Sequence, residues 1–392
     1  MSTRAEARPT PISQYKRKLF LRDSVVFLAL TCITLVLYAF TLILFKSFQS
    51  HRASLAIYWA DRGRDELSHD RADQAATSLR NALSFDPNDR RYEILLAEAL
   101  AESGKTDQAM NYFLNLWDTQ PGDGFINLEL ARLSRQKGLS QQAVNYYHAS
   151  IFGDWPGDGT TRRRSIRLEL ADYLASIHDT TAARAELLIA SGNASNDVEA
   201  NLALGKKFDV IGDAPDALNS YKKALEGNPR EQTALAAAGR LSLQLGDYGV
   251  ARAFFNKDLK EGIQDPTLRD QVLALTEEAT RLEELNVSPN LPNRERADHL
   301  LLGKAIAEAR FNSCIVQMGN ASQEPAALLE LKQRWNAAKN DSLRTLQLDE
   351  ASQDSLSALI SDTEILTSKV CGAPSGDDAI LLKLAAAREL NH

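Results

Sequence analysis

A period of 34 residues is the feature that most constrains what this chain can fold into. Aligned frames begin at Ala56, Arg90, Gly124, Arg164, Val198 and Gln232, with six extra residues, 158–163, before the fourth frame. The eighth position of every frame is small: Gly63, Ala97, Ala131, Ala171, Gly205 and Gly239. The twentieth is always alanine: Ala75, Ala109, Ala143, Ala183, Ala217 and Ala251. The twenty-fourth is always large: Leu79, Phe113, Tyr147, Leu187, Tyr221 and Phe255. Repeats of this length predict a solenoid, because each unit buries its apolar face only against its neighbours.

Within each frame these columns predict two antiparallel helices. Small residues let the helices approach closely, and the large residue fills the space beside them. The fifteenth position lies between the two helices and mostly suits a left-handed C-cap: Asp70, Gly104, Gly138, His178, Gly212 and Gly246. Prolines near four frame ends stop the second helix: Pro87, Pro121, Pro156 and Pro229. We therefore predict an all-α fold with about six helix pairs over residues 56–265.

These repeats resemble the tetratricopeptide repeat family. The first repeat carries the pattern at Trp59, Gly63, Ala75, Ala82 and Pro87, and the fifth at Leu204, Gly205, Phe208, Ala217, Tyr221, Ala224 and Pro229. The fourth and sixth repeats depart from it, with Ser195 and Ile263 in place of proline and Asp258 at the last small position. The resemblance implies a right-handed solenoid that binds peptides and partner proteins.

An uncharged apolar run of 22 residues, Ser24–Phe45, precedes the repeats. A helix of that length reaches about 33 Å, enough to cross a hydrocarbon core of about 30 Å. A secretory signal peptide would have a shorter apolar region and a small-residue cleavage site. The run instead continues into Lys46-Ser47-Phe48-Gln49, so we predict one uncleaved transmembrane helix over residues 24–45.

Charge is distributed unevenly about this run. The first 23 residues form a basic tail of net charge +4, and since the chain carries −7, the remainder carries −11. Basic residues favour the cytoplasmic side, so we expect residues 1–23 in the cytoplasm and the body in the periplasm or another extracytoplasmic space. An acidic body also argues against nucleic acid as a partner.

The C-terminal third, residues 266–392, leaves the period but stays helical. We predict an amphipathic helix over 267–285, a break over 287–293, and further helices near 294–318, 325–347, 351–370 and 377–390, which cap or extend the solenoid. Cys314 and Cys371 lie in this region. Outside the cytoplasm they would form a disulfide; the alternative is two unrelated buried thiols. Cys32 lies within the apolar run and needs no further role.

Catalytic and metal-binding patterns are absent. Gly104-Lys105-Thr106 lacks the leading glycine of a phosphate-binding loop, the six histidines are scattered, and there is no Cys-x-x-Cys. We therefore expect no enzyme activity, no metal, no cofactor and no small-molecule substrate.

The candidate binding residues occupy the ninth frame position, which the family resemblance places on the groove of the solenoid. We call them the inner column: Arg64, Glu98, Arg132, Asp172, Lys206 and Arg240. A mixed-charge, net basic stripe would hold an extended acidic or polar segment; the alternative is an ordinary solvated helix face. The inserted segment 155–164 is either a contact loop or a tolerated one.

These observations together predict a membrane-anchored adaptor that binds protein or peptide partners. The combination of anchor and repeats resembles bacterial envelope proteins that assist secretion, envelope assembly or cytochrome maturation. Two alternatives stay open: an accessory subunit of a large membrane complex, and a receptor that faces the cytosol.

Overall fold

The computed structural model describes residues 11–157, 159–192, 197–319 and 326–389. In these ranges the chain is helical, and the only β pairing is one isolated bridge between Asp123 and Asp154. The predicted all-α fold is confirmed. The chain divides into two compact units, residues 1–170 and 171–392, and each is described by itself.

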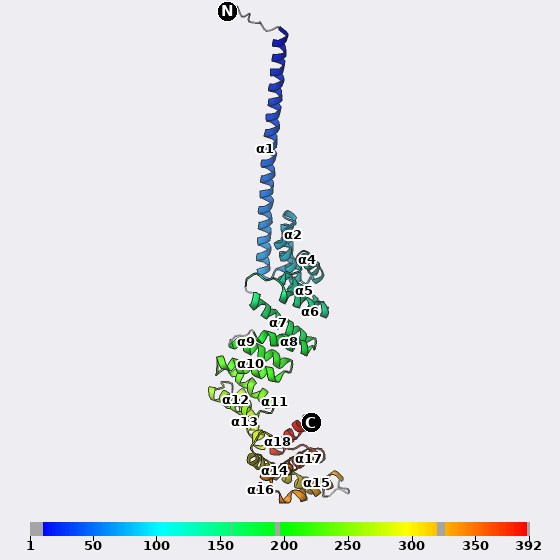
Figure 1. The fold of residues 1–392 in the computed structure, drawn as a ribbon, viewed down its shortest axis with the longest axis vertical. Coiled ribbons are helices and arrows are strands. Elements are labelled where there is room, and N and C mark those ends of the chain that lie inside the picture. The colour runs from blue at the N-terminus through cyan, green and yellow to red at the C-terminus, as the bar shows by residue number, and fades with distance from the viewer. Residues whose placement is uncertain (1–10, 158, 193–196, 320–325, 390–392) are drawn as a thin grey trace, which may run out of the picture. The chain divides into compact units, whose positions relative to one another are not determined.

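Unit 1 begins with one unbroken helix, α1 (Pro11–Ser68), shown in blue in Figure 1. The uncharged run lies within it, fully exposed, and is long and apolar enough to cross a membrane. The first ten residues of the predicted basic tail lie outside the described residues. Because no proline or glycine interrupts residues 46–62, the same helix continues into the first repeat. Arg52 secures this junction by donating to the carbonyl oxygen of Phe85 at 2.7 Å.

Six helix pairs follow the predicted frames. The C-terminal part of α1 pairs with α2 (Ala72–Phe85), and the other five pairs are α3 (Arg90–Glu102) with α4 (Thr106–Thr119), α5 (Gly124–Gln136) with α6 (Ser140–Phe152), α7 (Gly159–Ser176) with α8 (Thr180–Gly192), α9 (Val198–Val210) with α10 (Ala214–Gly227), and α11 (Gln232–Gln244) with α12 (Tyr248–Glu261). The predicted solenoid architecture is confirmed.

The residues at three repeated frame positions form the core of these pairs. All residues at the eighth, twentieth and twenty-fourth positions are buried. The small eighth residue meets the large twenty-fourth residue of its own pair: a Cβ on Gly239 would lie 2.5 Å from a ring carbon of Phe255. The same contact joins Gly205 to Tyr221 and Gly63 to Leu79. Glycine at these places is therefore a packing requirement.

The turn inside each pair is left-handed in all six repeats. Four glycines have φ between +72° and +82°, and the two other residues at this position, Asp70 and His178, have φ of 56° and 63°. The predicted C-cap is confirmed. No other non-glycine residue in the described part of the chain has a positive φ.

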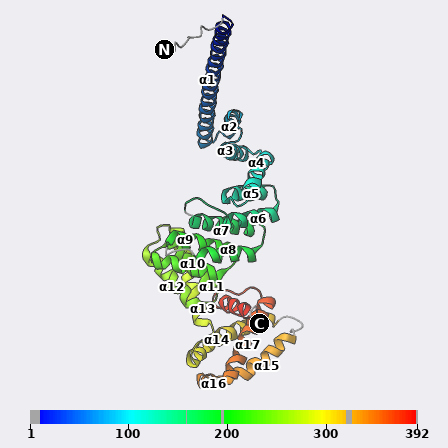
Figure 2. The same cartoon turned by 45° about the horizontal axis from the view of Figure 1, so that its top comes forward.

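The described part of unit 2 ends in six helices that do not follow the 34-residue repeat. These are α13 (Pro266–Leu285), α14 (Asn293–Met318), α15 (Ala326–Ala337), α16 (Leu343–Leu348), α17 (Glu350–Val370) and α18 (Asp377–Glu389). Figure 2 shows α14, α15, α17 and α18 gathered at one end of this unit. Their core includes Leu300, Phe311, Trp335, Leu356 and Leu381. The predicted helix over 325–347 is wrong, because a 3₁₀ turn at Ala338–Asn340 ends α15 and Ser342 caps a separate α16.

Candidate functional site

The inner column occupies the first helix of every pair. In unit 1 both of its cations have internal partners. Arg64 pairs with Asp61 at 2.7 Å, one helical turn earlier. Arg132 donates to Glu129 at 2.8 Å and, with two nitrogens, to Glu169 of α7 at 2.9 and 2.7 Å. These guanidinium groups are therefore already neutralised.

Glu98, the remaining inner-column residue of unit 1, lies near other acidic side chains. The pKa of its carboxyl is raised to about 7, first by burial and then by Glu129 and Glu102. Burial also raises the pKa of Glu129 against the opposing effect of Arg132. Burial also acts to raise the pKa of Glu169, but hydrogen bonds from Arg132 and from the Tyr147 hydroxyl outweigh it, so the pKa of Glu169 is lowered overall. This part of the inner face is acidic, whereas the column alone predicted a net basic stripe.

Unit 2 presents the remaining three column residues. Asp172 of α7 accepts a bond from Lys207 of α9 at 2.5 Å, and Arg240 of α11 pairs with Asp209 of α9. Lys206 is exposed and has no ion pair or hydrogen bond within the described ranges. Its ammonium group is the one inner-column cation without a carboxylate partner among those residues.

An open pocket of about 190 Å³ lies next to Lys206. Its lining is mainly apolar and comes from the first helices α7 and α9, with Leu187 of α8 also contributing: Ala171, Asp172, Ala175, Leu187, Lys206, Lys207, Val210 and Ile211. Val210 is 80% exposed although it is apolar. Drug-sized ligand pockets usually exceed about 300 Å³, so this volume suits a single side chain rather than a small molecule.

Val210 is an exception to the repeat pattern. It lies outside the inner column, but the sequence alone shows that it is unusual. The thirteenth frame position is polar in the other five repeats: Ser68, Glu102, Gln136, Ser176 and Gln244. The helix pair therefore does not require an apolar residue there. An exposed valine thus lies beside the apolar pocket at a position that the fold leaves polar.

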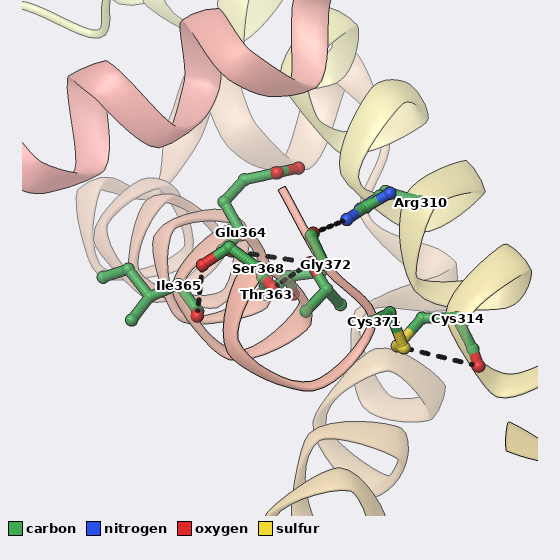
Figure 3. The surroundings of a disulfide bond; sticks show 9 residues. Arg310, Cys314, Thr363, Glu364, Ile365, Ser368, Cys371 and Gly372 are labelled. Carbon is green, nitrogen blue, oxygen red and sulfur yellow. Dashed lines mark hydrogen bonds between the residues drawn. A yellow bond between two sulfur atoms is a disulfide. The ribbon is translucent and has the colours of Figure 1, made fainter. Parts of the chain in front are cut away.

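The cysteine pair lies in the C-terminal helices of unit 2. Cys314 of α14 and Cys371 at the end of α17 have Cα atoms 5.7 Å apart and sulfur atoms at bonding distance (Figure 3). Arg310 donates to the carbonyl oxygen of Gly372 at 2.6 Å, beside the same junction. This geometry fits the disulfide that the sequence predicted.

A buried carboxyl lies in the same surroundings. Glu364 is fully buried, and neither of its oxygens has a hydrogen-bond partner in the described part of the chain. Burial first, and Asp378 second, raise its pKa to about 8, while Arg310 acts in the opposite direction. Among the described residues no three His, Cys, Asp or Glu side chains are grouped so as to hold a metal ion.

Comparison with known proteins gives a family match and several fold matches. A tetratricopeptide repeat family model matches residues 60–124 and 202–266. No curated protein sequence matches the chain.

Three solved structures are similar over about half of the chain or more. YrrB, described as a TPR protein with an unusual peptide-binding site, is 16% identical, with a TM-score of 0.38 over 51% of this chain and 99% of its own. PilW, a type IV pilus biogenesis factor, is 17% identical, with a TM-score of 0.38 over 56% and 98%. The C-terminal part of a TPR repeat-containing protein from Cytophaga hutchinsonii is 15% identical, with a TM-score of 0.42 over 76% and 98%. These identities are too low to carry function from those proteins to this chain.

Proposed function

We propose that the chain is a membrane-anchored tetratricopeptide repeat scaffold that holds an extended segment of a partner protein on the first helices of its pairs. The observation that carries this proposal is the apolar pocket beside Lys206. The role is one of binding rather than catalysis.

The pocket defines what the segment must offer. A leucine-sized or aromatic side chain would enter between α7 and α9 and cover Val210. A carboxylate next to it would pair with the Lys206 ammonium, a charge-assisted bond that needs no internal pair to break. The other inner-column cations would contribute less, because each already has a carboxylate partner that competes with the segment.

Two substitutions test this site, each with a matched control. Lys206→Glu reverses the charge, and Lys222→Glu makes the same change on the second helix α10, also exposed. Val210→Asp places a charge in the pocket, and Val316→Asp does so at a residue of equal exposure, 80% against 79%. We expect both test variants to weaken partner capture by about tenfold or more, the scale of an interface hot spot.

The measurement is photo-crosslinking in intact cells followed by recovery in mild detergent. A crosslinker at position 210 should yield a defined adduct that Lys206→Glu reduces and Lys222→Glu does not. An adduct that forms equally well at position 316, or that survives Lys206→Glu, contradicts the proposal.

We also propose that α1 anchors the chain, with the N-terminus cytoplasmic and the body in the periplasm. Support comes from the exposed uncharged run and from the cluster Lys16, Arg17, Lys18 and Arg22 before it. Because α1 is continuous, the first repeat would begin about 16 Å beyond the apolar run, at 1.5 Å per residue. Topology reporters fused after residue 392 test the orientation, and a cytoplasmic signal there contradicts it.

A role in envelope assembly, secretion or cytochrome maturation fits this placement. Its support is the resemblance of an anchored repeat array to envelope proteins of that kind. Identification of the crosslinked partner tests it directly. A partner that copurifies in fixed stoichiometry through stringent washing would favour a permanent subunit instead.

A further inference from the structure

The turn between α6 and α7 in unit 1 carries a basic and aromatic surface separate from the Lys206 pocket. It comprises Phe152 at the end of α6, Trp155 in the turn, and Arg162 and Arg167 in the first half of α7. The six-residue insertion of the fourth frame falls here, and Asp158 lies outside the described residues. We call this set the arginine–aromatic turn.

The polypeptide around this turn is tightly held, so its side chains project from a fixed base. Asp154 exchanges two backbone bonds with the α4–α5 turn, donating to the oxygen of Gly122 at 2.8 Å and accepting from Gly124 at 3.0 Å. The Trp155 indole donates to the Ser150 oxygen at 2.9 Å. Arg163 donates to the oxygens of Ile151 and Gly153 at 2.9 and 3.2 Å.

Two guanidinium groups lie over two aromatic rings on this base. The Arg162 guanidinium lies 5.4 Å from the centre of the Trp155 ring, and that of Arg167 lies 5.7 Å from the centre of Phe152. Stacking of this kind orients a guanidinium without neutralising its charge. The outward hydrogen-bonding edge of Arg162 is therefore available to a ligand, since Arg162 has no carboxylate partner in the described ranges.

Phe152 is not required by the repeat. It is 77% exposed, and the equivalent twenty-ninth position is occupied elsewhere by Ser84, Asp118, Gly192, Glu226 and Lys260. Five helix pairs thus form without an apolar side chain there. An exposed phenylalanine at such a position, beside a stacked arginine, has the composition of an interface hot spot.

Charge then indicates the class of ligand. Several other arginines of unit 1 pair with carboxylates, as Arg90 does with Asp123 and Arg132 with Glu169. At this turn Arg162, Arg163 and Arg164 have no such pair among the described residues, in a chain of net charge −7. The Arg164 Nε–H is buried without an acceptor in the same part of the chain. A carboxylate matches a guanidinium edge in shape and charge.

We propose that the arginine–aromatic turn is a second docking surface, which takes an acidic segment of a partner protein with an apolar side chain next to its carboxylates. A carboxylate binds Arg162, and the apolar side chain packs on Phe152. A protein segment fits better than nucleic acid, because the surface offers few cations and nucleic-acid binding depends on many phosphate contacts. It also fits better than a membrane, since three helix pairs separate α7 from the apolar run of α1 along the chain.

The test is selection from a random-peptide display library on the full chain in detergent. We expect enrichment of sequences with Asp or Glu beside Leu or Phe, followed by binding of the selected labelled peptide measured by fluorescence anisotropy. Arg162→Glu and Phe152→Ser should each weaken that binding by about tenfold or more. The serine is the residue that the first repeat has at this position, so the helix pair tolerates it.

Three controls separate the explanations. Arg80→Glu makes the same charge change on α2, where Arg80 is exposed and, among the described residues, bonds only to Gln108, and it should leave binding unchanged. Lys206→Glu should also leave it unchanged; a peptide that responds to Lys206→Glu and not to Arg162→Glu belongs to the pocket and counts against this surface. Binding that Arg80→Glu weakens equally is bulk charge attraction, and binding by anionic nanodiscs in place of the peptide assigns the turn to lipid. Either result overturns the proposal.

Discussion

The repeat array and the C-terminal helices are stabilised by contacts of different range. In the array each large residue packs on a small residue sixteen positions earlier, as Phe255 does on Gly239. In the C-terminal helices, the joining contacts bridge much longer distances along the chain. Arg281 of α13 pairs with Asp377 of α18, 96 residues away, and Lys383 with Glu278, 105 residues away.

This difference predicts how each region responds to damage. A local contact affects its own repeat and the nearest neighbours, because an array behaves approximately as a one-dimensional sum of units. A contact between distant segments supports every helix that it encloses. Substitutions in the array should therefore have confined effects, and those in the C-terminal helices should spread from α13 to α18.

The largest expected effect is loss of the Cys314–Cys371 bond. Their separation of 57 residues corresponds to about 4 kcal/mol in the loop-entropy description. We expect Cys314→Ala to accelerate hydrogen exchange throughout α14–α18 and to leave α2–α6 unchanged. Cys32→Ala is the control, since that exposed cysteine has no disulfide. Intact mass with and without reductant must first show the bond; two free thiols in native membranes would contradict it.

The sequence allowed the array to be predicted because its determinants recur. Position 8 must be small where position 24 is large, and position 15 must accept a positive φ, so six copies report the same rule. The C-terminal helices offer one copy of each contact. The break between α15 and α16 has one short local signal, the cap residue Ser342, and nothing local indicates that Arg281 meets Asp377.

The net charge of the inner column depends on neighbours that the column itself does not contain. Asp61 precedes Arg64 by three residues and Glu129 precedes Arg132 by three, the spacing of helical ion pairs. Val210 and Phe152 could have been found from the sequence, since each is apolar at a frame position that is polar or glycine in the other repeats. Regular positions report the fold, and the proposed contact surfaces rest on exceptions at exposed positions.

The second prediction concerns pH and the C-terminal helices. Glu364 of α17 is enclosed by Arg310 of α14 and Asp378 of α18, and burial raises the pKa of both carboxyls. The pKa of Glu364 in the folded protein, about 8, lies above its ordinary value of 4.5, so the unfolded chain releases this proton first. The contribution of Glu364 to stability should thus be fully present below about pH 4.5 and be lost as the pH rises towards 8, by at most about 1.4 kcal/mol per pH unit.

Glu364→Gln should flatten that slope, because the amide cannot ionise. Glu330→Gln, at an exposed position of α15, should retain it. Denaturation of the detergent-solubilised chain across this pH range, followed by hydrogen exchange in α17 and α18, provides the measurement. A wild-type profile that is flat in these helices would show that Glu364 is not enclosed as described.

The smallest effect should come from the array and tests whether it is local. His178 adopts φ 63° in the turn between α7 and α8, where the next repeat has Gly212 at φ 79°. A non-glycine residue in this conformation costs about 1–2 kcal/mol, of which glycine's greater freedom in the unfolded chain offsets part. His178→Gly should therefore stabilise the α7–α8 pair by about 1 kcal/mol, and Gly212→His should destabilise α9–α10 by a similar amount.

No atom lies within 4 Å of a Cβ built on Gly212, so this reciprocal exchange changes the backbone preference without a clash at the Cβ atom. Hydrogen exchange resolved by helix should record opposite changes confined to the two repeats and their neighbours. Changes that reach α14–α18 would mean that the array transmits strain as the C-terminal helices do, and the distinction between local and long-range stabilisation would be lost.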